Sequence, residues 1–333
     1  MEILHYPLPF LTMISYTDFA EIQTNLQSQD MDDQLIALYC FVDEFITSLQ
    51  SHLLPYIHKP QRGIPPRKSF AIWLCAMITL ALFFPFSGHK TYQSYHRFLM
   101  THHKKDFPHL PDYPGFVQWL NTVSSFCYIL AQMITRFFRE QTGSDEACIK
   151  FADSTRLKVC ENQRIQSHKV AKGKAGRWKS SRWWFYGFKL HIICDEWMRI
   201  LGFTLTSGNT DDRIWLEMMW EGIVGMVVTD GGYVGKDFQE KAKNHGIFLL
   251  AAVRANMKKL MTTWQHALFK MRQSVERVFS VLKYRMGMET SLPRSQRWYF
   301  ARYIFCLTVY QIQQLFKTHP KQQRVALSKG KLA

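Results

Sequence analysis

Three carboxylates stand at positions where charged side chains are unusual. Asp153 lies inside a predicted strand, and Asp230 ends the apolar run MVVTD just before a glycine turn. Glu276 lies on a predicted helix over residues 265–286. Charged groups are rarely buried without a partner, so two strand acids and one helix acid are candidates for a shared divalent metal. Each acid taken alone is also compatible with a helix cap, a turn or a salt bridge.

A metal site of this composition would do phosphoryl chemistry. Mg²⁺ prefers hard oxygen ligands and keeps several of its waters, so two or three carboxylates are sufficient. Two such ions about 3.5–4 Å apart activate an attacking oxygen and stabilise the leaving oxygen of a phosphodiester. The sequence has no HExxH motif and no Cys/His spacing typical of zinc, so we expect no zinc site.

Two cations share the helical face of Glu276. At about 100° per residue, Arg272, Glu276 and Lys283 fall within about 40° of one another on a regular helix. The stripe lies beside an apolar face made of Val275, Val278, Phe279 and Leu282. A carboxylate between two cations is either a salt bridge or a metal ligand flanked by phosphate-binding groups, and the charge of the whole chain bears on this choice.

The net charge of the chain predicts a polyanionic partner. The formal net charge is +16, which favours nucleic acid first and an anionic membrane second. Residues 1–60 contain one basic and eight acidic residues, a net charge of −7, so the remainder carries +23. The surface that binds the polyanion is therefore expected after residue 60.

The densest basic segment covers residues 163–182. It holds seven Lys and Arg residues and no acid, among them Lys172, Lys174 and Arg177. Such a run is either a solvated loop or a loop that contacts phosphates, and the electrostatics favour the second. Lys258 and Lys259 are predicted to be surface cations near the same partner.

Other polar and aromatic residues follow the predicted strands. Lys189 and His191 share one face of a strand and would line either a groove or the edge of the core. Asn209, Asp212 and Arg213 follow the next strand. They could cap the helix that begins there or contact DNA, and the role of a cap is favoured. Trp183 and Trp184 could stack on a displaced base, although core packing is favoured for at least one.

The first half of the sequence is predicted to be helical. Residues 1–33 show little periodicity and are expected to form a loosely ordered extension. Helical spacing follows over residues 34–57, 67–84, 89–104 and 115–141. The uncharged stretch 70–86 is shorter than the roughly 20 residues of a spanning helix, so a core helix is favoured over a membrane anchor.

The second half alternates strands and helices. Strands are predicted over residues 147–159, 183–196, 199–209, 225–230 and 247–254, and helices over residues 211–223, 236–245 and 265–286. This order is typical of an α/β domain with a mixed β-sheet flanked by helices. The seven cysteines are scattered and form no CxxC, which favours a reducing cytosol, and no secretory signal is evident.

The runs FADSTRLKVC, WWFYGFKLHIICDE, LTSGNTDDR, VVTDGGYVG, VRANMKK and FKMRQSVERVFSVLK closely resemble bacterial insertion-sequence transposases with an RNase H-like DDE domain. Those enzymes often show a Y-x2-R-x3-E-x6-K pattern, which here is Phe269, Arg272, Glu276 and Lys283. Phe269 replaces the usual tyrosine, Gly231 stands where a basic residue is common, and the stretch 291–300 looks altered.

The resemblance implies that Asp153, Asp230 and Glu276 are the catalytic triad and bind two Mg²⁺ ions, with Mn²⁺ as a substitute. It implies DNA contacts, which we assign to Arg272, Lys283, Lys189, Lys172, Lys174, Arg177 and Lys258. The expected reaction is hydrolysis at the element's ends followed by 3′-OH strand transfer. The alternatives are a metal-dependent nuclease, a catalytically inactive DNA-binding derivative and a membrane-anchored protein.

The resemblance also implies an organisation for the chain. A helical N-terminal domain over residues 34–143 would bind the ends and self-associate, and an RNase H-like mixed β-sheet domain would cover residues 144–316. A basic tail over residues 317–333 would follow. The expected partners are the DNA of the element's ends, target DNA and a second copy of the chain in a homodimer. No membrane is expected as a partner. The protein is expected in the bacterial cytoplasm, associated with the nucleoid.

Overall fold

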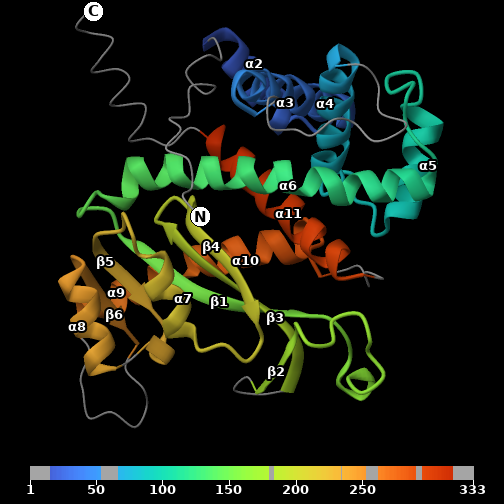
Figure 1. Cartoon of the computed structure of the whole chain (residues 1–333). Helices are drawn as coiled ribbons and strands as arrows, with labels where there is room; N and C mark the ends of the chain where they lie inside the picture. The colour runs from blue at the N-terminus through green and yellow to red at the C-terminus, as the bar shows by residue number, and fades with distance from the viewer. Residues whose placement is uncertain are drawn as a thin grey trace, which may run out of the picture. The chain divides into compact units, whose positions relative to one another are not determined.

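The computed structural model describes residues 16–53, 67–179, 184–233, 235–252, 262–289 and 295–317. The chain divides into two compact units (Figure 1). One unit consists of residues 1–133 together with residues 300–333, and the other consists of residues 134–299. Each unit is described by itself below.

The first unit is helical in its described residues. It contains α2 (Tyr16–Gln27), α3 (Met31–Leu53), α4 (Arg67–Phe83), α5 (Tyr92–His102), most of α6 (Tyr113–Phe138) and most of α11 (Gln296–Leu315). Its core is rich in aromatic side chains, which include Phe41, Phe45, Phe83, Tyr95 and Phe116. The four helices predicted over residues 34–141 are confirmed, with ends that differ by a few residues.

The structure differs from the sequence prediction at both ends of this unit. Part of the range 1–33, expected to be loosely ordered, forms α2, whose Ile22 and Leu26 are buried against α3. Helix α11 was not predicted, and from residue 300 it belongs to the helical unit rather than to the expected 144–316 domain. The hydroxyl of Thr308 on this helix donates to the Cys127 carbonyl at 3.0 Å, which ties α11 to α6.

Helix α4 contains the uncharged stretch that the sequence left open to a membrane interpretation. From Leu74 to Phe84 almost every side chain is buried inside the helical unit, Thr79 included. Among the described residues, no helix has both the length and the hydrophobicity that crossing a bilayer requires. The prediction of a core helix is confirmed.

The second unit is built on a mixed sheet. The described strands are β1 (Lys150–Lys158), β2 (Gly176–Lys179), β3 (Trp184–Asp195), β4 (Ile200–Ser207), β5 (Gly225–Thr229) and β6 (Ile247–Ala251). Their order is β2-β3-β1-β5-β6, and β4 also pairs with β3. Strand β1 is antiparallel to β3 and parallel to β5, and β5 is parallel to β6. The predicted mixed sheet is confirmed, whereas β2 lies within the basic segment expected to be a loop.

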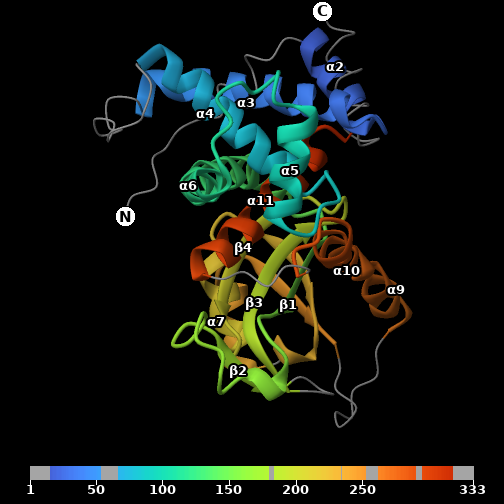
Figure 2. The same ribbon diagram turned by 90° about the vertical axis from the view of Figure 1, so that its right-hand side faces the viewer.

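Helices cover both faces of this sheet (Figure 2). They are α7 (Asp212–Met219), α8 (Lys236–Asn244), α9 (Thr263–Met271) and α10 (Gln273–Ser280). The pairing of β1 with β3 places Asp153 opposite Ile192, and Ser154 opposite His191. Because side chains alternate along a strand, Asp153 and Ser154 point to opposite faces. Arg272 at the start of α10 binds Asp153, and Trp215 of α7 packs on His191, so the two helices cover different faces.

The helix predicted over residues 265–286 is interrupted. Helix α9 begins with a capping box between Thr262 and Gln265. At Arg272 the hydrogen bonds shorten to i→i−3, from Arg272 N to the Phe269 carbonyl and from Val275 N to the Arg272 carbonyl, a pattern of 3₁₀ type. A π-helical turn over Val281–Arg285 follows α10. A regular helical projection therefore does not hold across this whole segment.

Candidate active site

Asp153 is a buried carboxylate in the middle of β1. Its Oδ1 accepts a hydrogen bond from the Ser154 amide at 2.8 Å, and its Oδ2 accepts one from Arg272 Nη2 at 2.8 Å. Burial raises the pKa of Asp153 to about 6, an effect that Arg272 opposes and the charge of Asp230 reinforces. Asp153 is thus an acid that ionises close to neutral pH, beside a second carboxylate.

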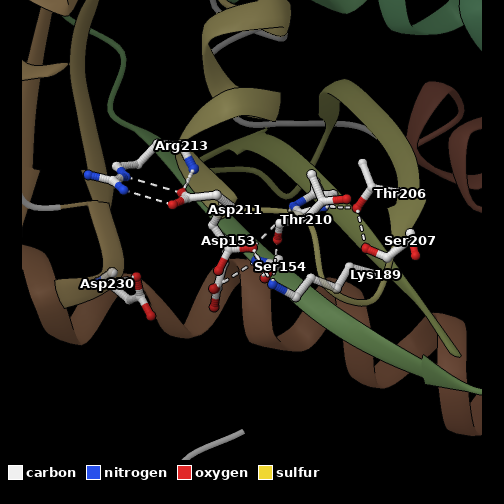
Figure 3. Close-up of polar contacts among 12 residues, drawn as sticks. Asp153, Ser154, Lys189, Thr206, Ser207, Thr210, Asp211, Arg213 and Asp230 are labelled. Atoms are coloured by element: carbon white, nitrogen blue, oxygen red, sulfur yellow. Dashed lines mark hydrogen bonds and ion pairs between the residues drawn. The ribbon is translucent and has the colours of Figure 1, made fainter. Parts of the chain in front are cut away.

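Asp230 directly follows β5, the parallel neighbour of β1. Phe151 pairs with Val228, and continuing this register by two residues sets Asp230 level with Asp153. Neighbouring strands lie about 4.8 Å apart, so the two aspartates are neighbours across the sheet, and Figure 3 shows both side chains in one close-up. Asp230 Oδ1 accepts a hydrogen bond from the Gly232 amide at 2.8 Å, which holds the carboxylate in the glycine turn.

Glu276 reaches the same place from α10. Its Oε1 lies 3.7 Å from Arg272 Nη2, the atom that also binds Asp153, and its side chain is 59% exposed. Burial lowers the pKa of Arg272, but Asp153, Asp230 and Glu276 more than offset this and raise it. The structure therefore brings the three predicted acids together around one guanidinium.

The acid cluster suits a divalent cation in composition. Asp153 and Asp230 offer only carboxylate oxygens, as Mg²⁺ and Mn²⁺ prefer, and their mutual repulsion is relieved by positive charge. Arg272 supplies such charge in this structure. Within the described ranges, no three His, Cys, Asp or Glu side chains are already arranged to hold a metal ion, so Glu276 would complete a ligand set only by moving.

A second polar cluster lies on the opposite face of the sheet, beneath α7. Asp212 Oδ1 accepts hydrogen bonds from Ser154 Oγ and Lys189 Nζ, both at 3.1 Å, and lies 3.7 Å from His191 Nδ1. Burial, and then the charge of Lys189, lowers the pKa of His191 to about 3, so the imidazole is neutral. The N-cap of α7 is Asp211, whose Oδ1 accepts a hydrogen bond from the Arg213 amide at 2.8 Å, and not Asn209, Asp212 or Arg213, among which the cap was predicted.

Two predicted DNA-binding lysines have protein partners in this structure. Lys189 is buried, donates to the Thr210 carbonyl at 2.9 Å (Figure 3), and lies 5.0 Å above the Trp178 ring. Lys283 donates to the Arg156 carbonyl and lies 3.5 Å from Glu289 Oε1, and burial lowers its pKa. Their contact with DNA stays a prediction.

The other predicted DNA-binding residues lie around β2. Lys172, Lys174 and Arg177 are exposed, and the guanidinium of Arg177 lies 4.8 Å from the centre of the Trp184 ring. Trp178 and Trp184 are both about half exposed, so Trp184 is not a core residue. Lys258, Lys259 and Trp183 lie outside the described residues.

Sequence comparison adds an independent finding. Residues 143–296 match the family model described as a transposase DDE domain. The matched segment contains the mixed sheet, both polar clusters and the helix that carries Glu276. No curated protein and no solved structure matches the chain.

Proposed function

We propose that the chain is a transposase that hydrolyses DNA at the ends of its element and joins the freed 3′-OH to target DNA. The match of residues 143–296 to the family model of a transposase DDE domain supports this proposal. The observation that carries the proposal is the gathering of Asp153, Asp230 and Glu276 around Arg272. Acids from two neighbouring strands and a covering helix are the ligands that two-ion phosphodiester chemistry needs.

The three acids would hold the cation. Asp153 and Asp230 would bind Mg²⁺ or Mn²⁺, and Glu276 would complete the ligand set from α10. Two bound ions would supply activation of the attacking oxygen and stabilisation of the leaving oxygen. Since the pKa of Asp153 is about 6, its carboxylate is available above this pH and is lost to protonation below it.

Arg272 is suited to the DNA phosphate next to the reacting bond. A guanidinium binds oxyanions through paired N–H groups and keeps its charge at all working pH values. In this structure it balances the acids. A cation held by the acids would supply that balance instead, and Arg272 would then be available to a phosphate oxygen without leaving the site.

The exposed basic residues around β2 support DNA binding. Among the described residues, no hydrogen bond or ion pair joins Lys172, Lys174 or Arg177 to an acidic side chain. The chain as a whole carries a formal net charge of +16. Binding through such residues releases counterions, so affinity should fall steeply with salt. We further propose that the helical region binds the element's ends and that the active form is a homodimer. The proposed location is the bacterial cytoplasm, in association with the nucleoid.

The proposal is tested by DNA cleavage with Mg²⁺ or Mn²⁺ on the element's own ends. Wild type is compared with Asp153→Ala, Asp230→Ala and Glu276→Ala, and Lys241→Ala serves as a surface control because its partner, Glu217, is exposed as well. We expect metal-dependent cleavage by wild type and the control, and none by the three acid variants, with DNA binding kept. Full activity in any acid variant would remove that acid from the site.

The same assay separates the alternatives. Cleavage without joining of the 3′-OH to a second DNA would indicate a metal-dependent nuclease. Binding without cleavage by wild type would indicate a catalytically inactive DNA-binding derivative.

A further inference from the structure

Two exposed tryptophans lie on the neighbouring strands β2 and β3. Trp178 on β2 is 44% exposed and Trp184 on β3 is 46% exposed. In the antiparallel pairing of these strands, Trp178 lies opposite Phe185 and Trp184 lies opposite Lys179. Residues directly opposite each other point to the same face, and side chains alternate along a strand. The two indoles therefore point to opposite faces of the sheet and have different neighbours.

Trp184 lies beside two exposed cations. Lys179 is directly opposite it on β2, and Arg177, two residues earlier on β2, points to the same face. The guanidinium of Arg177 lies 4.8 Å from the centre of the Trp184 ring. Among the described residues, no ion pair or hydrogen bond joins Arg177 or Lys179 to an acidic side chain. This face thus presents an indole and two positive charges that no protein acid balances.

Trp178 has a different environment on the other face. Its ring lies 5.0 Å from Nζ of Lys189, a buried lysine that donates to Asp212 Oδ1 at 3.1 Å. The cation beside Trp178 is therefore balanced within the protein, unlike the cations beside Trp184. The backbone of Trp184 is also held in place, because its carbonyl accepts a hydrogen bond from Asn162 Nδ2 at 2.8 Å. Trp184 is thus an exposed ring on a fixed backbone.

An indole flanked by cations fits a nucleotide whose base is unpaired. Inside a duplex the faces of each base are covered by the neighbouring base pairs, so an indole cannot stack on them. An unpaired base leaves a face open. Proteins bind single strands by stacking bases on exposed aromatic side chains while cations contact the phosphates. Trp184, Arg177 and Lys179 provide both parts of such a site.

We propose that Trp184, Arg177 and Lys179 bind an unpaired nucleotide of the DNA, with the base stacked on the indole and the cations on the adjoining phosphates. The inference rests on the proposed function, because it takes DNA as the partner. The site is distinct from the acid cluster. Asp153 pairs with Ile192, eight residues along β3 from Trp184, which is about 26 Å on an extended strand.

The test is fluorescence anisotropy of the full chain in EDTA with two labelled DNAs, an oligothymidylate without base pairs and a fully paired duplex. We expect Trp184→Ala to bind the oligothymidylate about 5–140-fold more weakly than wild type, the effect of losing one stacked base. Its affinity for the duplex should change little. Trp184→Phe keeps an aromatic ring and should retain most of the single-strand affinity. An unchanged single-strand affinity in Trp184→Ala, or an equal loss on the duplex, would overturn the inference.

Trp178→Ala is the matched control, because Trp178 is similarly exposed on the opposite face of the same strand pair. Its single-strand affinity should equal that of wild type, and an equal loss in both alanine variants would overturn the inference. Lys179→Gln should make the negative slope of log binding constant against log salt concentration shallower by about 0.7 on the oligothymidylate. An unchanged slope would overturn the phosphate contact assigned to Lys179.

The assay contains no metal, so its result does not depend on the acid cluster. If wild type cleaves DNA but Trp184→Ala keeps its single-strand affinity, only the inference fails. If Trp184→Ala loses that affinity but wild type cleaves no DNA, the nucleotide site stands and the proposed reaction fails.

Discussion

The Arg272→Gln substitution removes the positive charge at the centre of the acid cluster. Arg272 Nη2 lies 2.8 Å from Asp153 Oδ2, and its charge and hydrogen bond hold the pKa of Asp153 down to about 6 against the effect of burial. A neighbouring cation lowers a carboxyl pKa by about 1–3 units. We therefore expect the pKa of Asp153 to rise by about that amount, which is about 1.4–4 kcal/mol of differential interaction.

The shift can be measured directly in the metal-free protein. Aspartate labelled with ¹³C at the side-chain carboxyl is titrated by nuclear magnetic resonance, and Asp153→Asn assigns the resonance by its disappearance. Wild type should show a midpoint near 6, so that Asp153 is mostly ionised at neutral pH. In Arg272→Gln the same carboxyl should be mostly protonated there.

Arg213→Gln is the matched control for lost charge. Arg213 binds Asp211 at 2.7 Å on the exposed side of α7, so its loss should leave the Asp153 midpoint in place. A midpoint of Asp153 that stays near 6 in Arg272→Gln would show that the guanidinium contributes nothing to the ionisation of this acid, contrary to the prediction.

Three further predictions follow from the same geometry. The folded-state pKa of Asp153, about 6, exceeds the unfolded value near 3.9, so the stability that its protonation contributes is present below about pH 4 and is lost as pH rises through 6. Urea unfolding in EDTA should show this loss, about 3 kcal/mol, in wild type and not in Asp153→Asn. Lys189→Met leaves the carboxylate of Asp212 without its nearest cation and should cost about 2–4 kcal/mol of unfolding free energy, whereas Lys241→Met, at an exposed ion pair, should cost about 0–1. Equal losses would contradict the structural role of Lys189. Changing Lys172, Lys174 and Arg177 to glutamine should make the negative slope of log binding constant against log salt concentration shallower, by about 0.9 for each lost phosphate contact. Fluorescence anisotropy measures this slope, and an unchanged slope would show that these residues do not contact DNA phosphates.

The three candidate acids could be selected from the sequence because their signals are local. Asp153 and Asp230 interrupt apolar strands, and Glu276 stands one helical turn after Arg272. The structure gathers these four residues. Strand composition and glycine turns likewise predict the mixed sheet, because each pattern depends only on neighbouring residues.

Contacts between strands and helices that are distant in the sequence could not be predicted, because no local pattern of residues indicates them. The interaction of Asp212 with Lys189 depends on the pairing of β3 with β1 and β4 and on where α7 begins, which no periodicity encodes. Helix α11 is buried on nearly all sides and so lacks an amphipathic pattern. The expected stripe of Arg272, Glu276 and Lys283 assumes a regular helix, whereas the segment tightens at Arg272 and becomes π-helical at 281.

The most direct test of the central claim is strand transfer from a pre-cleaved DNA end. A labelled duplex that carries the element's terminal sequence and a free 3′-OH is incubated with a target plasmid and Mn²⁺, and joined products are counted for wild type and Asp230→Asn. We expect joined products with wild type and none with Asp230→Asn at equal DNA binding. Equal joining by the two proteins would contradict the proposed role of Asp230 and, with it, the proposed function.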